Sequence, residues 1–135
     1  MSLENDLAKQ LHHIVALLSR ESDVILQNQL GIGLSQYKIL TTLQKYSDIQ
    51  QKRIAKELGQ TEASVSRQVK LLQQRGMLLS FKNPNNQREH LTGLTMKGAR
   101  VIATAEKLLA QYHRAFFERL TENQQRTLLT LINKL

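Results

Sequence analysis

The spacing of apolar residues is helical along most of the chain and changes once, between residues 77 and 94. In the first stretch, apolar residues recur every three or four positions and so share one helix face: Leu3, Leu7, Leu11, Ile14 and Leu18. After Gly76, apolar and polar residues alternate instead, as they do in a strand. This pattern predicts a mainly α-helical fold, in the α+β class, with a single β-hairpin.

Glycines and hydroxyl residues mark the predicted helix ends. Gly31 and Gly33 should end the first helix, and Ser35 is placed to cap the second. A short third helix is predicted over residues 50–58, and a fourth over residues 62–75. Four helices are therefore expected before the change of period.

The change of period predicts a hairpin. Residues 83–87 are the most turn-like cluster in the chain and include Pro84, its only proline. They are expected to join a strand at residues 77–82 to a second strand at residues 88–94.

Two more helices are predicted after the hairpin. Thr95 is placed to cap a long helix that runs to about Arg119, and Thr121 opens a last helix. That helix has one apolar stripe: Leu128, Leu131, Ile132 and Leu135. The chain has 135 residues, 41% of them hydrophobic, and no visible linker, so one domain over residues 1–135 is expected.

Helices and hairpin over residues 34–100 follow the plan of a winged helix-turn-helix. The sharpest local sign is the spacing of Ala55, Gly59 and Val65. Two helices that cross steeply need a small residue at their contact, a turn residue that tolerates positive φ, and an apolar residue on the second helix. These three positions supply all three features.

The fourth predicted helix turns Val65, Val69 and Leu72 inward and leaves an outer face that is small and polar at first, then basic. Such a face is typical of a recognition helix in the major groove. The residues predicted to contact DNA from this helix and its cap are Thr61, Ala63, Ser64, Ser66, Arg67, Lys70 and Gln74. In the hairpin, Arg88 is predicted to probe the minor groove, with Asn86 beside it.

Positive charge is concentrated in the same part of the chain. The whole sequence has a formal charge of +8, and residues 50–100 alone hold ten basic and three acidic side chains. This distribution favours a segment that meets a polyanion. The alternative is a solvated basic face that binds nothing.

Residues 34–98 resemble the core of the MarR family of bacterial transcriptional regulators. The resemblance is carried by Ser64-Val65-Ser66-Arg67-Gln68-Val69, by Arg75-Gly76-Met77-Leu78 and by Leu94-Thr95-Met96-Lys97-Gly98. It implies a homodimer formed by residues 1–33 and 101–135, which binds a pseudo-palindromic operator, usually as a repressor. It also implies relief by a small anionic or aromatic effector, whose contact residues the sequence does not identify.

The sequence departs from the family pattern at the wing and in the helix-turn-helix. Asn83 and Asn86 stand where the family often has Asp, although Arg88 is retained. Losing these carboxylates removes an ion pair that could orient Arg88 and makes the wing more positive. Gln60 and Gln68 stand where apolar residues are more usual in helix-turn-helix units.

Simpler interpretations stay open for each candidate. Arg67 and Lys70 are plausible as solvated helix charges, Ser64 and Ser66 as tolerated polar residues, and Arg88 as a loop charge. A second functional hypothesis is a winged-helix module that binds protein rather than DNA. The tyrosines are expected in the core or an interface, with a ligand-lining role as the alternative: Tyr37, Tyr46 and Tyr112.

Composition also argues against other classes of protein. The chain has no cysteine, so thiolate chemistry and disulfides are excluded. The four histidines do not have a metal-ligand spacing: His12, His13, His90 and His113. No catalytic motif, cofactor or membrane span is expected, and the protein is predicted to be cytoplasmic and not an enzyme.

Overall fold

The computed structural model describes residues 2–135 and confirms the mainly helical fold with one hairpin. The elements in chain order are α1 (Leu3–Leu30), α2 (Leu34–Lys45), α3 (Gln51–Leu58), α4 (Glu62–Gln74), β1 (Leu78–Asn83), β2 (Asn86–Leu94), α5 (Met96–Phe117) and α6 (Glu122–Ile132).

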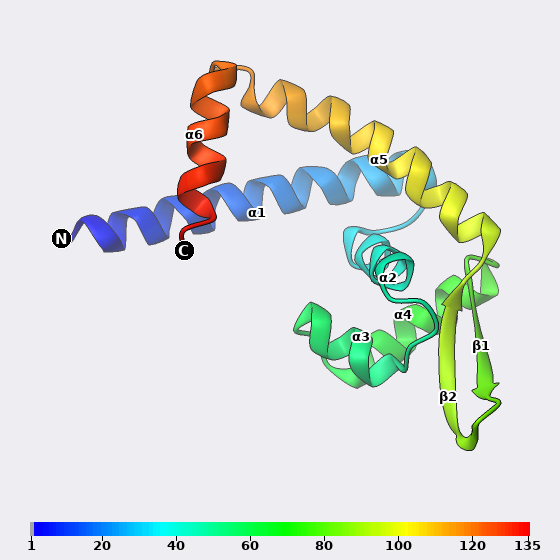
Figure 1. The fold of residues 1–135 in the computed structure, drawn as a ribbon. Helices are drawn as coiled ribbons and strands as arrows, with labels where there is room; N and C mark the ends of the chain where they lie inside the picture. The colour runs from blue at the N-terminus through cyan, green and yellow to red at the C-terminus, as the bar shows by residue number, and fades with distance from the viewer. Residues whose placement is uncertain (1) are drawn as a thin grey trace.

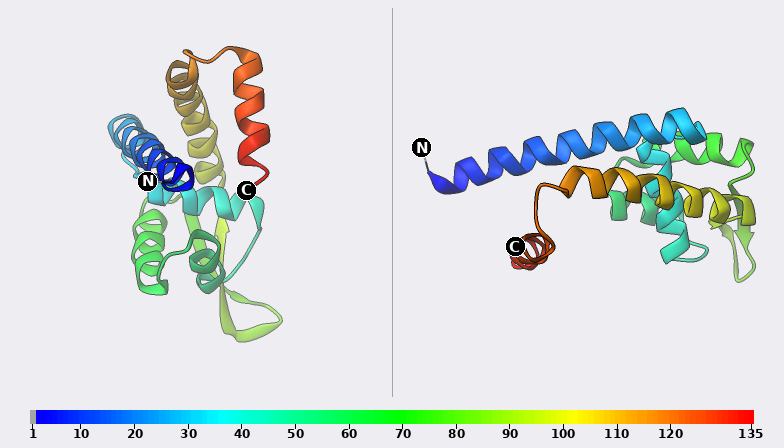
Figure 2. Two further views of the ribbon diagram at one scale, coloured as in Figure 1. Left: turned by 90° about the vertical axis from the view of Figure 1, so that its left-hand side faces the viewer. Right: turned by 90° about the horizontal axis from the view of Figure 1, so that it is seen from above.

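The molecule consists of a compact lobe and three helices that extend from it. Helices α2, α3 and α4 and the hairpin make up the lobe, and the hairpin projects beyond the helices at one end (Figure 1). Helices α1 and α5 run beside each other away from the lobe, and α6 turns off the far end of α5 and stands apart from it (Figure 2). The N-terminal half of α1 and all of α6 therefore lack cover from the lobe.

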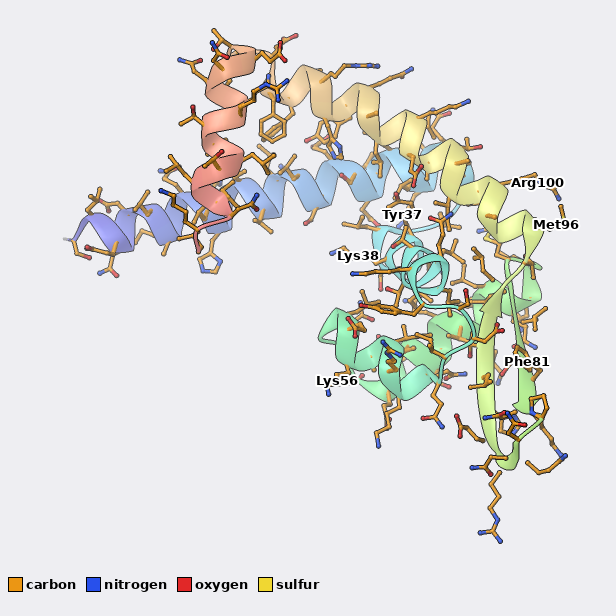
Figure 3. All side chains as sticks on the ribbon, viewed as in Figure 1. Tyr37, Lys38, Lys56, Phe81, Met96 and Arg100 are labelled. Atoms are coloured by element: carbon orange, nitrogen blue, oxygen red, sulfur yellow. The ribbon has the colours of Figure 1, made fainter. Side chains whose placement is uncertain are left out.

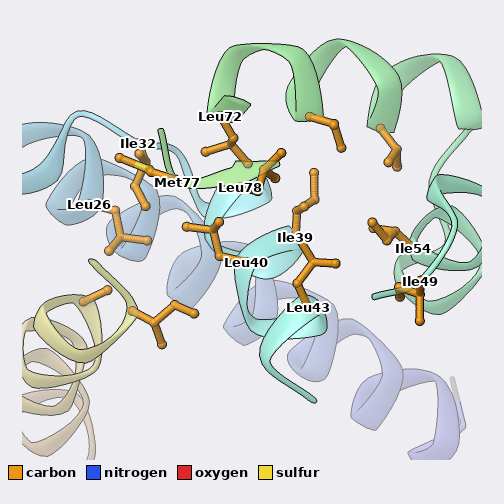
Figure 4. Packing of buried hydrophobic residues seen from close by; sticks show 14 of the residues in the cluster. Leu26, Ile32, Ile39, Leu40, Leu43, Ile49, Ile54, Leu72, Met77 and Leu78 are labelled. Atoms are coloured by element: carbon orange, nitrogen blue, oxygen red, sulfur yellow. The ribbon is translucent and has the colours of Figure 1, made fainter. Parts of the chain in front are cut away.

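The hydrophobic core is centred on α2. Ile39, Leu40 and Leu43 on this helix are at most 2% exposed, and side chains from the surrounding elements close around them (Figure 4). Leu26 reaches the core from α1, and Leu72 reaches it from α4. Because the core joins α1 to the lobe through α2, the long helices and the helix-turn-helix form one packed unit.

Several predicted helix ends are confirmed. The hydroxyl oxygens of Thr61, Thr95 and Thr121 each accept a hydrogen bond from a backbone amide in the first turn of the helix that follows. Gly59 ends α3 with a φ of 63°, in the left-handed region that glycine enters at little cost.

The prediction that Ser35 caps the second helix is wrong. The helix begins two residues earlier than predicted, at Leu34, with Gly33 at the capping position. The amide of Leu34 donates instead to Oδ1 of Asp23 on α1, at 2.8 Å. Ser35 Oγ accepts a hydrogen bond from Gln60 Nε2, at 3.1 Å. A carboxylate from a neighbouring helix thus replaces the expected local cap.

The hairpin turn is shorter than predicted. Asn83 pairs with Asn86 across a two-residue turn, so the second strand begins two residues before the predicted position. The next pair joins Lys82 to His90, so the register shifts and residues 87–89 bulge out of the ladder. Arg88 lies in this bulge.

The buried side of the hairpin is that of Leu78. Leu78 is 1% exposed, whereas Leu79 is 44% exposed. Leu79, which alternates in phase with Met77 in the sequence, therefore faces solvent. Met77 is itself buried but precedes the strand. The base of β2 also pairs with the loop before α3, because Ile49 and Thr92 exchange two backbone hydrogen bonds.

Candidate nucleic-acid interface

The helix-turn-helix has the predicted contact between α3 and α4. Ala55 is 3% exposed and Val65 is fully buried, as the spacing requires. Val69 and Leu72 are also buried, so α4 is anchored through one apolar stripe. The opposite face of α4 is consequently directed to solvent.

That face carries the side chains that the sequence identified. Ala63, Ser66, Arg67, Lys70 and Gln74 are exposed, whereas Ser64 is half-buried. Within this set, Ser66, Arg67 and Lys70 line one surface depression of about 260 Å³.

The structure adds two polar residues to the same depression, Gln51 and Gln73. Gln73 lies three positions after Lys70, so helical periodicity alone places it near the predicted set. Gln51 belongs to the first turn of α3, and its approach to α4 depends on how the two helices cross. No pattern in the sequence identifies it.

Thr61 holds the N-terminus of α4. Its Oγ1 accepts a hydrogen bond from the amide of Ser64 at 3.1 Å, and the side chain is exposed. A hydroxyl that accepts one bond still carries a hydrogen to donate. Thr61 can therefore cap the helix and donate to a phosphate oxygen at the same time.

The wing places Arg88 and Asn86 in a relation that the sequence did not predict. Asn86 Oδ1 accepts a hydrogen bond from the backbone amide of Arg88, at 3.2 Å. Asn83 makes a similar bond to the amide of Asn85, at 3.0 Å. The asparagines shape the backbone of the turn, and the side chain of Arg88 is exposed.

The recognition helix and the wing tip form two separate regions. The hairpin tip lies beyond the lobe's helices, so Arg88 is not brought together with the residues of α4 (Figure 1). A partner that contacts both regions must reach from the helices of the lobe to the tip of the hairpin.

The first helix of the pair adds further positive charge. Lys52, Arg53 and Lys56 are exposed on α3, and Lys56 projects from the lobe (Figure 3). The guanidinium of Arg53 lies 4.3 Å from the ring centre of Tyr46, a cation–π contact that holds it against the lobe. One role of Tyr46 is therefore to pack against a basic side chain.

Two tyrosines outside this surface have raised pKa values. Burial, followed by the carboxylate of Glu106 on α5, raises the pKa of Tyr37. For Tyr112, burial and then Glu21 raise the pKa, and Arg20 opposes them. Both phenols therefore keep their protons at neutral pH. That these tyrosines line an effector site stays a prediction.

Two other features are absent from residues 2–135. No cluster of three or more His, Asp or Glu side chains is arranged to hold a metal ion in this part of the chain. No helix described there is long and apolar enough to cross a membrane.

The architecture is that of a winged helix-turn-helix, a DNA-binding fold. Residues 32–90 match the model of the MarR family. The structure of wild-type MarR from E. coli in its apo form superposes with a TM-score of 0.88 at 26% identity, covering 95% of this chain and 94% of that one. Mutant MarR C80S from E. coli complexed with operator DNA gives a TM-score of 0.75 at 25% identity, covering 99% and 98%.

Two other proteins are similar. YdgJ of Bacillus subtilis (strain 168), an uncharacterised HTH-type transcriptional regulator, is 25% identical over 105 residues, or 78% of this chain. The match spans 64% of YdgJ, slightly less than two thirds of its length. The PcaV transcriptional regulator from Streptomyces coelicolor, in complex with its natural ligand, shares the fold with a TM-score of 0.74 at 22% identity over 95% of this chain and 92% of that one.

The family match, the shared fold and the curated relative agree with one another. Residues 32–90 carry the MarR family domain, and the chain has the fold of MarR family transcriptional regulators. Proteins of this family are DNA-binding regulators rather than enzymes.

Proposed function

We propose that this protein is a homodimeric repressor that binds a pseudo-palindromic operator. Each subunit inserts α4 into a major groove and lays the wing over the adjacent minor groove. The observation that carries the proposal is the exposed face of α4, where Ser66, Arg67 and Lys70 surround one depression opposite a buried apolar stripe.

Uncovered apolar helices support the dimer. On α1, Leu3 is 71% exposed and Leu7 is 55% exposed, and on α6, Leu129 is 61% exposed and Leu131 is 53% exposed. Exposed apolar helix faces of this kind mark an interface, and a two-fold axis would let the faces of two copies cover each other. Residues 1–33 and 101–135 then form the dimerisation part, and residues 34–100 the DNA-binding core.

Repression is the mode of regulation that we propose for such a dimer. Two recognition helices read half-sites about one helical turn apart, and a dimer bound there blocks access to a promoter. The structure of PcaV contains that protein's natural ligand. For this chain we propose an anionic or aromatic effector that changes the distance between the two recognition helices and so weakens binding.

A salt titration tests DNA binding against the alternative of a protein-binding module. Affinity for a fluorescent operator duplex would be measured by anisotropy between 50 and 200 mM salt. A protein that contacts 6–10 phosphates loses about 10³–10⁵ in affinity over this range. A shallow dependence, together with equal affinity for all duplex sequences, would contradict the proposal and favour the protein-binding module.

The operator would come from selection of random duplexes with the purified protein, followed by sequencing. Two inverted half-sites are expected. Recovery of a single half-site without symmetry would contradict the homodimer. Addition of benzoate, a simple aromatic anion, tests the effector separately. Benzoate should lower only the affinity of the protein for the operator.

A further inference from the structure

Arg75 joins the end of the recognition helix to the end of α1. Its Nη1 donates to the backbone oxygen of Gly31 at 2.5 Å, and its Nη2 donates to that of Leu30 at 3.1 Å. The last turn of α1 has no basic residue of its own. Arg75 therefore satisfies two carbonyls at a helix C-terminus, where the helix dipole also favours a cation.

The backbone next to this side chain is held by α5. Lys97 Nζ donates to the backbone oxygen of Arg75 at 2.6 Å. Thr95 Oγ1 donates to the backbone oxygen of Gly76, also at 2.6 Å. The C-terminal end of α4 is thus fixed between the end of α1 and the start of α5, the two long helices that leave the lobe.

A polar depression of about 330 Å³ lies where Gln68 of α4 faces the end of α1 and the start of α2. The other residues that line it are Asp23, Gln27, Gly31, Gly33, Ser35 and Gln36. Gly31, whose carbonyl accepts a hydrogen bond from Arg75, is one of these lining residues, so the bonds of Arg75 join α4 to α1 beside the depression.

We propose that Arg75 is a positioning residue that fixes the direction of α4 relative to α1 and α5, and through them the separation of the two recognition helices in the dimer. The proposal rests on the proposed function and adds a specific consequence. One base pair moves a half-site by about 3.4 Å and by about a tenth of a helical turn. A looser α4 should accept operators with the wrong spacing.

The DNA test compares three variants on four duplexes. The duplexes carry the operator, the operator with one base pair inserted between half-sites, the operator with one removed, and a single half-site. Arg75→Gln removes the charge, and Arg75→Lys retains it. Arg100→Gln is the matched control, because Arg100 is exposed on α5 and points away from the lobe (Figure 3).

Arg75→Gln should reduce the preference for correct spacing about tenfold, which is the effect of losing roughly one charge-assisted hydrogen bond. Affinity for the single half-site should stay within about twofold of wild type. Arg75→Lys should restore part of the preference, and Arg100→Gln should leave it unchanged. An unaltered spacing preference in Arg75→Gln, or an equal loss on the half-site, would overturn the proposal.

A measurement without DNA separates this proposal from the proposed function. The chain contains no cysteine, so spin labels can be attached at Arg20→Cys on α1 and Gln73→Cys on α4. Labelled chains are diluted in unlabelled protein so that distances within one subunit are recorded. A broader distance distribution in Arg75→Gln supports the positioning role of Arg75 even if no operator is found, and an unchanged width refutes it.

Discussion

Gln60 offers the sharpest stability prediction. It lies in the turn between α3 and α4, where its Nε2 donates to Ser35 Oγ at 3.1 Å. Its Oε1 is buried and has no hydrogen-bond partner among residues 2–135. Because the side chain satisfies only half of its amide, replacing Gln60 with leucine should stabilise the fold.

The magnitude follows from two opposing effects. Removing a buried acceptor without a partner relieves about 1–3 kcal/mol, and losing the neutral bond to Ser35 costs about 0.5–1.5 kcal/mol. The net expectation is a gain of about 1 kcal/mol in the free energy of unfolding. For a domain of this size that gain corresponds to a rise of about 3–5 °C in Tm.

Urea unfolding and calorimetry would measure the gain, with Gln68→Leu as the matched control. Gln68 lines the polar depression rather than the core, so this control should stay within about 0.5 kcal/mol of wild type. Ser35→Ala should destabilise wild type by about 1–2 kcal/mol but have little effect in the Gln60→Leu background. A less stable Gln60→Leu, or an equal cost of Ser35→Ala in both backgrounds, would refute the reasoning.

Three further predictions concern DNA binding and assembly. Arg67→Ala should cost roughly 1–3 kcal/mol on operator DNA and narrow the gap to random DNA in anisotropy assays, whereas Lys70→Ala should weaken both alike. If Arg67→Ala lowers the affinity for operator and random DNA equally, Arg67 contacts phosphate and not a base edge. Arg88→Ala should lower operator affinity without shifting the unfolding midpoint, because its side chain is exposed, and full affinity on A·T-rich and G·C-rich flanks would exclude the wing from DNA reading. Deleting residues 1–18 should give monomer or aggregate by light scattering, and a dimer of unchanged stability would contradict the role of α1.

The candidate surface was largely predictable because a helix repeats locally. Once Val65, Val69 and Leu72 were assigned to the core, the 3.6-residue period placed Arg67 and Lys70 on the opposite face. The structure shows these residues exposed, as the period requires. The wing was less predictable, because the register shift that isolates Arg88 depends on the pairing of two strands and not on either strand alone.

The sequence by itself determined the type and order of the elements and most of their ends. Thr61, Thr95 and Thr121 cap helices through bonds to amides three residues away, so the chemistry of each cap is contained in one short segment. The change from helical to alternating spacing after Gly76 likewise needs no knowledge of distant residues. These features report local conformational preference, which adjacent residues fix.

Only the tertiary structure decided which distant groups meet. Asp23 displaced Ser35 as the cap of α2 because the packing of α1 brings a carboxylate to the amide of Leu34. Arg75 reaches the carbonyls of Gly31 and Leu30 across 44 and 45 residues of chain, respectively. Such bonds form only once folding has brought the helices together, since the same polar groups are satisfied by water in the unfolded chain. Their partners are therefore a property of the packed fold and not of any short segment.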